Sequence, residues 1–146
     1  IVAGYGADHA LVYGAGDFAD RVLAATGGEG VDVVYDSVGK DTFDASLRCL
    51  APTGTFALFG IASGMPPPME LMKLDLLTSQ YFVRPSLSAA TRPRQQLLTL
   101  AQATFHDVAH DILDVRIHAR YALREAGAAH AAIESRATSG ALVLLP

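Results

Sequence analysis

Short apolar segments alternate with stretches of helical spacing in the first half of this 146-residue chain. The segments at 10–13 (ALVY), 31–35 (VDVVY) and 55–59 (TFALF) are rich in β-branched and aromatic residues, which favours buried β-strands. The stretches between them, at 17–26 and 42–50, carry apolar residues at the spacing of one helix face. Strands that alternate with helices predict an α/β fold built on a parallel sheet.

Capping and helix-breaking residues predict where these two helices begin and end. Asp17 is the expected N-cap of the first helix, and Asp41 or Thr42 is that of the second. The first helix is expected to end at the glycine pair 27–28 and the second at the Pro-Thr-Gly of 52–54, because proline and glycine do not continue a helix.

The second half of the chain is predicted to form a long helix between further strands. Between 93 and 111 the apolar residues form one continuous stripe, which indicates an amphipathic helix packed on another part of the protein. The other expected elements are a short helix or loop at 69–77, a strand at 79–83, an alternating strand at 115–123, an Ala-rich helix at 124–135 and a closing strand at 141–145.

Composition excludes several classes of protein. With 51% hydrophobic and 18% charged residues, the chain is too apolar for a disordered segment and long enough for one domain. The net charge of −4, with scattered Lys and Arg, argues against nucleic acid as a partner. No apolar run reaches the roughly 18 residues of a membrane span, and no signal peptide is recognisable, so a cytoplasmic location is expected. Cys49 is alone and cannot form an internal disulfide.

Residues 14–19 (GAGDFA) match the G-x-G-x-x-A pattern of a dinucleotide-binding turn. They follow a predicted strand, and Asp36 lies at the end of the next strand, roughly where a ribose-binding acid is expected. However, Asp17 would place a carboxylate where the pyrophosphate must bind. Two interpretations therefore remain, a phosphate-binding turn and an ordinary strand-turn-helix connection.

His106 and His110 stand four positions apart in the long helix with an acid between them, similar to an H-E-x-x-H zinc motif. Both lie off the apolar stripe, and no third ligand is near in sequence, whereas catalytic zinc needs three protein ligands. A solvated helix end is the favoured interpretation. His9, His118 and His130 stand singly, and no metal site is predicted.

Two turns follow predicted strands and are rich in small residues, at 36–39 (DSVG) and 59–64 (FGIASG). In open α/β sheets, ligands bind in the crevice outside the carboxyl ends of the strands, where small residues let a ligand approach the backbone. These turns are therefore candidates for a binding site.

These turns also carry a family resemblance. Residues 33–43 (VVYDSVGKDTF) and 46–50 (SLRCL) resemble the zinc-independent quinone oxidoreductases, the zeta-crystallin-like branch of the medium-chain dehydrogenases/reductases. Further blocks agree in the same order over nearly the whole chain: 6–9 (GADH), 59–60 (FG) with 62–64 (ASG), 84–87 (RPSL), and 134–140 (ESRATSG) running into 144–146 (LLP).

The resemblance implies NADPH-dependent reduction of a quinone or another electron-poor carbonyl compound by hydride transfer without a metal. In such an enzyme the cofactor carries the chemistry and the protein supplies positioning, so no catalytic side chain is expected. The cofactor-binding residues that it implies are Tyr13 near the adenosine 2′-phosphate, Asp36, Ser37, Val38, Phe59 and Gly60 along the cofactor cleft, Ser63 beside it, and Arg84 and Arg136 near the nicotinamide end or the diphosphate.

The chain also departs from the family pattern. Gly14, Ala15 and Gly16 follow Tyr13, where family members commonly carry charged residues. The glycine-rich phosphate loop, a basic residue selecting NADPH and the substrate-binding domain are expected upstream of this chain. We therefore expect the distal half of a Rossmann-type sheet, with a partial dinucleotide-binding domain at 1–110 and a carboxyl-terminal segment at 111–146 that returns to the catalytic domain.

The family's sheet order, 3-2-1-4-5-6, leaves the segment at 10–13 without a neighbouring strand in this chain. The strand at 76–83 is expected to pair with its counterpart in a homodimer. Three alternatives stay open: a reductase of enone or enoyl acceptors, a non-catalytic truncated copy that dimerises or binds nucleotide, and a self-contained dinucleotide binder that uses 14–19 and Asp36.

Overall fold

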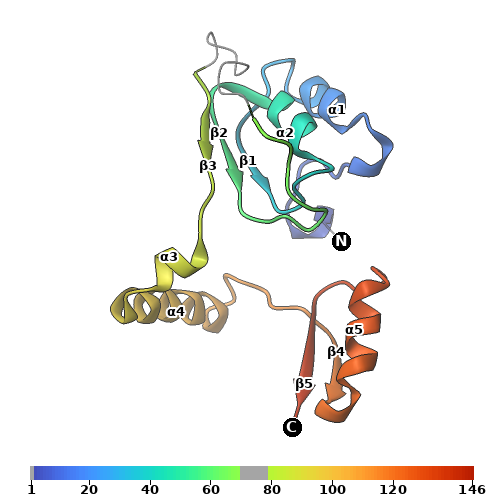
Figure 1. The fold of residues 1–146 in the computed structure, drawn as a ribbon, viewed down its shortest axis with the longest axis vertical. Coiled ribbons are helices and arrows are strands. Elements are labelled where there is room, and N and C mark those ends of the chain that lie inside the picture. The colour runs from blue at the N-terminus through green and yellow to red at the C-terminus, as the bar shows by residue number, and fades with distance from the viewer. Residues whose placement is uncertain (1, 70–78) are drawn as a thin grey trace. The chain divides into compact units, whose positions relative to one another are not determined.

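The computed structural model describes residues 2–69 and 79–146 and divides the chain into two compact units, 1–87 and 88–146. In Figure 1 the first unit runs from blue to yellow-green and the second from yellow to red. The division after Leu87 does not coincide with the boundary expected at residue 110. The assignment of 1–110 to a partial dinucleotide-binding domain and of 111–146 to a returning segment stays a prediction.

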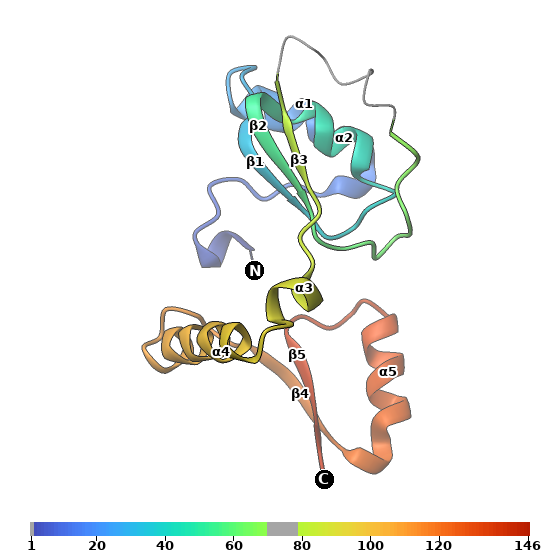
Figure 2. The same ribbon diagram turned by 60° about the vertical axis from the view of Figure 1, so that its left-hand side comes forward.

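A parallel sheet of three strands, in the order β1-β2-β3, forms the first unit (Figures 1 and 2). The strands are β1 (Val31–Asp36), β2 (Leu50–Leu58) and β3 (Tyr81–Val83). The predicted α/β fold with a parallel sheet is confirmed, as is the adjacency of these strands. The predicted elements at 70–78 lie outside the described residues.

Two helices accompany this sheet. Helix α2 (Phe43–Arg48) contacts both β1 and β2, and α1 (Phe18–Ala25) packs beside α2. An ion pair between Arg48 and Asp20 joins the two helices at the surface. The glycines at 27 and 28, both with positive φ, follow α1 as predicted.

The core of the first unit lies between α2 and the sheet. Phe43 from α2 and Phe56 from β2 are buried, with ring centroids 5.5 Å apart and the rings edge to face. Phe82 from β3 stacks on Phe56 at 5.3 Å. Aromatic pairs of this kind add to the stabilisation from burial. The remaining core side chains are Leu50 and Leu58, with Val34, Leu47 and Met69 packed against them.

The strand predicted at 10–13 is wrong. Residues 2–12 form no strand, and Tyr13–Ala15 form a short 3-10 helix, η2. Val12 has extended backbone angles (φ −94°, ψ 119°), but no described residue pairs with it. An extended segment becomes a strand only when a neighbouring segment accepts and donates its backbone hydrogen bonds. The local sequence pattern alone therefore does not determine whether residues 10–13 form a strand.

The second helix ends at Arg48, before the expected Pro-Thr-Gly of 52–54, and these three residues belong to β2 rather than to the connection before it. Val31 pairs with Leu50 and Val33 pairs with Thr55, so the register shifts between them and a bulge takes up the extra residues. Thr53 within this bulge has a φ of 62°. A bulge lets a strand continue through residues that would break a regular ladder.

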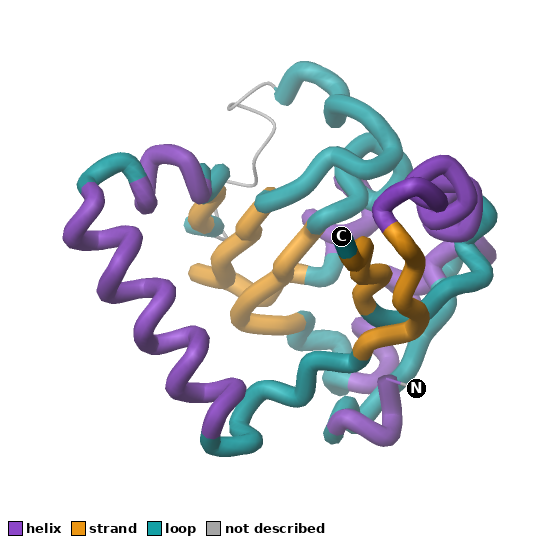
Figure 3. Tube along the Cα trace, turned by 90° about the horizontal axis from the view of Figure 1, so that it is seen from below, coloured by secondary structure: helices purple, strands orange, loops and turns teal. Residues whose placement is uncertain are grey.

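The second unit contains a parallel pair of strands, β4 (Ile117–Ala122) and β5 (Ala141–Leu145). The connection between them is the 3-10 helix η4 (Leu123–Glu125) followed by α5 (Ala126–Glu134), which contacts both strands (Figure 3). The strands and helix predicted at 115–145 are thereby confirmed, with small shifts at their ends.

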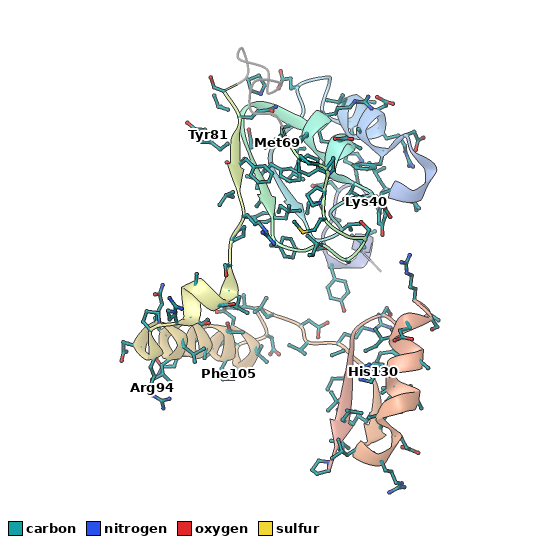
Figure 4. The ribbon with its side chains drawn as sticks, viewed as in Figure 1. Lys40, Met69, Tyr81, Arg94, Phe105 and His130 are labelled. Atoms are coloured by element: carbon teal, nitrogen blue, oxygen red, sulfur yellow. The ribbon has the colours of Figure 1, made fainter. Side chains whose placement is uncertain are left out.

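Two further helices precede these strands, α3 (Leu87–Thr91) and α4 (Arg94–Ala109). The predicted long helix is confirmed. Within its own unit its apolar stripe stays exposed, since Leu97 is 44% exposed and Phe105 is 71% exposed (Figure 4). No helix within residues 2–69 and 79–146 is both long and apolar enough to span a lipid bilayer.

Candidate functional site

The turns that follow β1 and β2 are joined along their length by backbone hydrogen bonds. The N–H of Phe59 donates to the carbonyl of Asp36 at 2.9 Å, where the strands end. Further along both turns, the N–H of Ser63 donates to the carbonyl of Val38 at 2.8 Å. The two turns therefore form one interlocked structure at the carboxyl edge of the sheet, where ligands bind in α/β folds.

The Asp36 side chain holds the first turn together from inside. One carboxylate oxygen accepts the N–H groups of Val38 and Gly39 at 2.8 and 2.9 Å. The other accepts the hydroxyls of Thr42 and Ser46 at 2.7 and 2.9 Å. Asp36 is only 4% exposed. Because both oxygens are taken up by these internal donors, this carboxylate fixes the turn and the start of α2 rather than presenting itself to a ligand.

These donors also set the ionisation of Asp36. Burial by itself would raise the pKa of this carboxyl, but the hydrogen bonds from Gly39, Thr42, Ser46 and Val38 outweigh it and hold the pKa below the ordinary 3.8. The carboxylate is therefore charged in the folded protein at neutral pH.

The lowered pKa of Asp36 predicts a loss of stability in acid. The unfolded chain, with the higher pKa, binds the proton first, so the contribution is complete above the unfolded value of 3.8 and disappears as pH falls through the folded pKa. We expect the free energy of unfolding in urea to fall more steeply for the wild type than for Asp36→Asn between neutral pH and about pH 3. Parallel curves for the two proteins would contradict this assignment.

Gly60 packs directly against the backbone of the first turn. A Cβ at this position would lie 2.5 Å from the carbonyl oxygen of Ser37 and 2.8 Å from its Cα. Such distances are far inside van der Waals contact and involve backbone atoms that cannot move aside alone. Any residue larger than glycine must therefore push the turns apart.

The Ser63 hydroxyl also joins the two turns. Its Oγ donates to the carbonyl of Val38 at 2.8 Å and accepts the N–H of Asp41 at 3.0 Å. Ser63 thus anchors the second turn to the first through two bonds from one side chain. Its predicted place beside the cofactor cleft is compatible with this positioning role.

Two hollows open at this edge and gather most of the residues that the sequence singled out. Tyr13, Asp36, Ser37 and Val38 line a hollow of about 280 Å³ together with Leu11, Phe18, Val34, Tyr35, Thr42 and Ser46. A second hollow, of about 390 Å³, lies where β2 and β3 end. It is lined by Phe59, Gly60 and Arg84 with Leu58, Ile61, Pro85, Ser86 and Leu87.

Arg136 lies in the second unit, just past the end of α5. Its φ is 57°, the left-handed conformation that usually selects glycine after a helix, and its N–H donates to the carbonyl of Ile133 at 3.1 Å. A side chain in this conformation costs about 1 kcal/mol. Strain of this kind is common where a residue is kept for a ligand.

Replacement of Arg136 by glycine is expected to raise stability and to lower the affinity for the cofactor. Arg136→Gly is expected to raise the free energy of unfolding by up to about 1 kcal/mol because the strain is released. If the guanidinium binds the cofactor, NADPH affinity falls in the same variant. Asp111, with a φ of 56°, is the matched control, since Asp111→Gly should stabilise without changing NADPH affinity. Equal NADPH affinity in both variants would remove Arg136 from the site. Urea unfolding and NADPH titration measure the two effects.

Residues that hold Asp36 were not recognised as functional from the sequence. Thr42 was expected to cap α2, but its hydroxyl makes no cap bond and instead donates to Asp36. Ser46 lies one turn further along the same helix and donates to the same oxygen. Two hydroxyl residues four positions apart, shortly after an acid at the end of a strand, are the sequence signal for this network.

The glycine motif at 14–19 lacks the setting of a phosphate-binding turn. Its pattern requires a preceding strand, and the described residues before it form none. Asp17 stands directly before α1 as predicted, but its side chain makes no cap bond. Asp36, the acid expected on the ribose, already has its oxygens occupied by four donors. These contacts favour an ordinary connection at this position.

The described residues hold no cluster of three or more metal-ligating side chains. Across the part of the chain that the structure describes, no three His, Cys, Asp or Glu side chains lie close enough together to hold a metal ion. Cys49 is buried, its thiol donates to the carbonyl of Ala45 at 3.2 Å, and burial raises the pKa of this thiol. Cys49 is therefore a structural residue.

Comparisons with known proteins agree on one family. Residues 5–144 match the family described as zinc-binding dehydrogenase. The chain is 40% identical to a 2-haloacrylate reductase from Burkholderia sp over 142 residues, and 41% identical to a quinone oxidoreductase from Salmonella typhimurium over 143 residues. Each match covers 97% of this chain, but 43% and 44% of those proteins. The chain thus spans less than half the length of these relatives.

Solved structures give the same result. The quinone oxidoreductase of Escherichia coli, in complex with NADPH, superimposes with a TM-score of 0.87 at 36% identity, over 99% of this chain and 45% of that one. The family's description names zinc, but the described residues lack the three protein ligands of a catalytic zinc site. We therefore assign no catalytic zinc site to them.

Proposed function

Since this chain belongs to the zinc-binding dehydrogenase family within the medium-chain dehydrogenase/reductase superfamily, we propose that it forms the NADPH-binding part of a reductase. The reductase passes a hydride from NADPH to a quinone or another electron-poor carbonyl compound, without zinc. The interlocked turns after β1 and β2 are the observation that carries this proposal, because they open two hollows at the carboxyl edge of a parallel sheet.

The residues around these hollows fit a dinucleotide. Tyr13 presents a half-exposed phenol, which can donate to a phosphate oxygen at the adenosine end. Ser37 and Val38 line the same hollow, and Gly60, which lines the other hollow, packs against the backbone of Ser37. When bound, NADPH supplies the hydride, and the chain's task is to hold and orient it.

Each predicted residue then has a distinct task. Asp36 and Ser63 are positioning residues, because their polar atoms are used between the turns. Phe59 gives the second hollow an apolar wall. Arg84 places a positive charge beside Phe59, suited to a phosphate or to the nicotinamide end. Arg136 is assigned a similar charge role by its likeness to the family.

The acceptor of the hydride is inferred from the relatives. The relatives of nearly equal similarity are named for quinones and for 2-haloacrylate, which share an electron-poor unsaturated group. We propose a quinone as the acceptor, with an enone or enoyl compound as the alternative.

Two assays of the protein in its natural length test this proposal. A thermal-shift titration with NADPH should raise stability by about 2.7 kcal/mol at a hundredfold excess over Kd, and more than NADH does at the same concentration. Oxidation of NADPH, followed optically, should then depend on an added quinone. Binding without oxidation by any acceptor would favour the non-catalytic interpretation, and no binding at all would overturn the proposal.

We also propose a homodimer through the strand that contains β3. Tyr81 and Val83 are 63% and 43% exposed, and the Tyr81 side chain points away from the sheet (Figure 4). β3 pairs with β2 on one side only, and no described strand covers its other edge. An open apolar edge favours pairing with a second copy. Light scattering is expected to give twice the chain mass at micromolar concentration, and a monomer would contradict this arrangement.

A further inference from the structure

The carboxyl-terminal end of α4 carries two histidines whose rings lie face to face. His106 is in the last turn of the helix and His110 is its C-cap, one turn further on. Their ring centroids are 4.0 Å apart, and the ring planes meet at 22°. Both residues are exposed, so the pair is open to ions from solvent. The cofactor site assigned above uses neither residue.

Hydrogen bonds at Nδ1 favour the same tautomer in both rings. The Nδ1 of His110 lies 2.8 Å from the carbonyl oxygen of His106, an acceptor that requires a proton on Nδ1. The Nδ1 of His106 lies 3.4 Å from an Asp107 carboxylate oxygen, which favours a proton there as well. In this tautomer the lone pair of each neutral ring is on Nε2. A carbonyl or carboxylate behind Nδ1 is the usual support of a metal-binding histidine.

The surrounding charge attracts a cation. A helix ends in carbonyl groups that give its carboxyl terminus a partial negative charge. Residues 103–115 contain Asp107, Asp111 and Asp114 but no lysine or arginine. Two imidazole lone pairs in a locally negative setting are suited to a divalent transition-metal ion, since imidazole nitrogen is a preferred ligand of zinc and copper.

We propose that His106 and His110 bind one divalent transition-metal ion, Zn²⁺ or Cu²⁺, through their Nε2 atoms, with water completing the coordination. The rings are nearly parallel, so they must tilt toward each other to share the ion, which exposed side chains can do. The ion links two successive turns of the helix and stabilises the carboxyl-terminal end of α4. With two protein ligands, this is a surface site and differs from a three-ligand catalytic zinc centre.

The identity of the ion follows from the ligand set. Affinity for a nitrogen site rises along the first-row series to Cu²⁺ and is lower for Zn²⁺, whereas Mg²⁺ prefers oxygen ligands. We therefore expect Cu²⁺ to bind more tightly than Zn²⁺ and Mg²⁺ not to compete with either. Equal binding of all three ions would indicate a nonspecific acidic surface and overturn the proposal.

Calorimetric titration of the full chain with Zn²⁺ tests the two ligands. The wild type should bind one equivalent, and His106→Gln and His110→Gln should each weaken binding by at least about tenfold. His118→Gln, which alters another exposed histidine, is the matched control and should bind as the wild type does. The substituted side chains are exposed, so these variants should keep the fold, which the far-ultraviolet circular dichroism spectrum checks.

Nitrogen NMR of the histidine rings gives a second, direct readout. Zn²⁺ should shift the Nε2 resonances of His106 and His110 and leave those of His9, His118 and His130 in place. Unchanged Zn²⁺ affinity in either ligand variant, equal loss in His118→Gln, or no saturable binding in the wild type would each overturn the proposal. The variants should retain NADPH binding, so these outcomes test the metal site separately from the cofactor site.

Discussion

Gly60→Ala is expected to separate the two turns and to abolish most of the NADPH-dependent activity. The added Cβ would lie 2.5 Å from the carbonyl oxygen of Ser37, so the turn must move by about an ångström or more to relieve the overlap. Overpacking of this kind costs about 1–3 kcal/mol of stability. A displacement of about 1 Å in a positioning element can lower turnover about a hundredfold. Urea unfolding and NADPH oxidation with a quinone measure the two effects.

Gly4→Ala is the matched control for this variant. Nothing lies within 4 Å of the position that a Cβ on Gly4 would occupy, and its φ is not positive. The same change of residue should therefore alter the free energy of unfolding, and the activation free energy of NADPH oxidation, by no more than about 0.5 kcal/mol. If Gly60→Ala behaved like Gly4→Ala, the close approach of the turns would have no functional importance.

Asp36→Ala is expected to destabilise the first unit strongly. It removes four hydrogen bonds to one buried carboxylate. The N–H groups of Val38 and Gly39 and the hydroxyl of Ser46 then lose this acceptor, while the hydroxyl of Thr42 keeps only its longer contact of 3.3 Å with the carbonyl of Gly39. Unsatisfied buried donors cost about 1–3 kcal/mol each, so a total loss of at least about 3 kcal/mol is expected even if water reaches some of them. The free energy of unfolding in urea measures it.

Asp32 offers a control on the same strand. Its side chain is exposed, and no described donor is hydrogen-bonded to it in the way that four donors are bonded to Asp36. Asp32→Ala should change stability by no more than about 0.5 kcal/mol. A loss below about 1 kcal/mol in Asp36→Ala would show that the internal network of this carboxylate is not what holds the turn.

Local periodicity was sufficient for much of the fold. The β-branched run at 31–35 and the apolar run at 55–59 became the adjacent parallel strands β1 and β2, because their patterns suit a sheet buried by α2. The segment at 10–13 has the same local character and formed no strand. Pairing is non-local, so sequence pattern could not show that no described neighbour is available.

Most of the predicted site residues line the two hollows, but their contacts could not be predicted from spacing. Spacing suggested Asp36 as a ribose-binding acid, whereas its carboxylate is occupied by four internal donors. Gly60 was expected to line the cleft, and its closeness to Ser37 gives a steric reason that no spacing rule contains. The left-handed backbone of Arg136 was likewise invisible, since arginine gives no local sign of a positive φ.

A titration of the ¹⁵N-labelled protein with NADPH, followed by amide chemical shifts, tests most directly whether the cofactor lies across the two interlocked turns. We expect the largest shifts at Ser37, Val38, Phe59 and Gly60, with smaller shifts at the amides of 14–17. The reverse, with the largest shifts at 14–17 and none at the turns after β1 and β2, would show that the glycine motif is the phosphate-binding turn and that the cofactor site lies elsewhere.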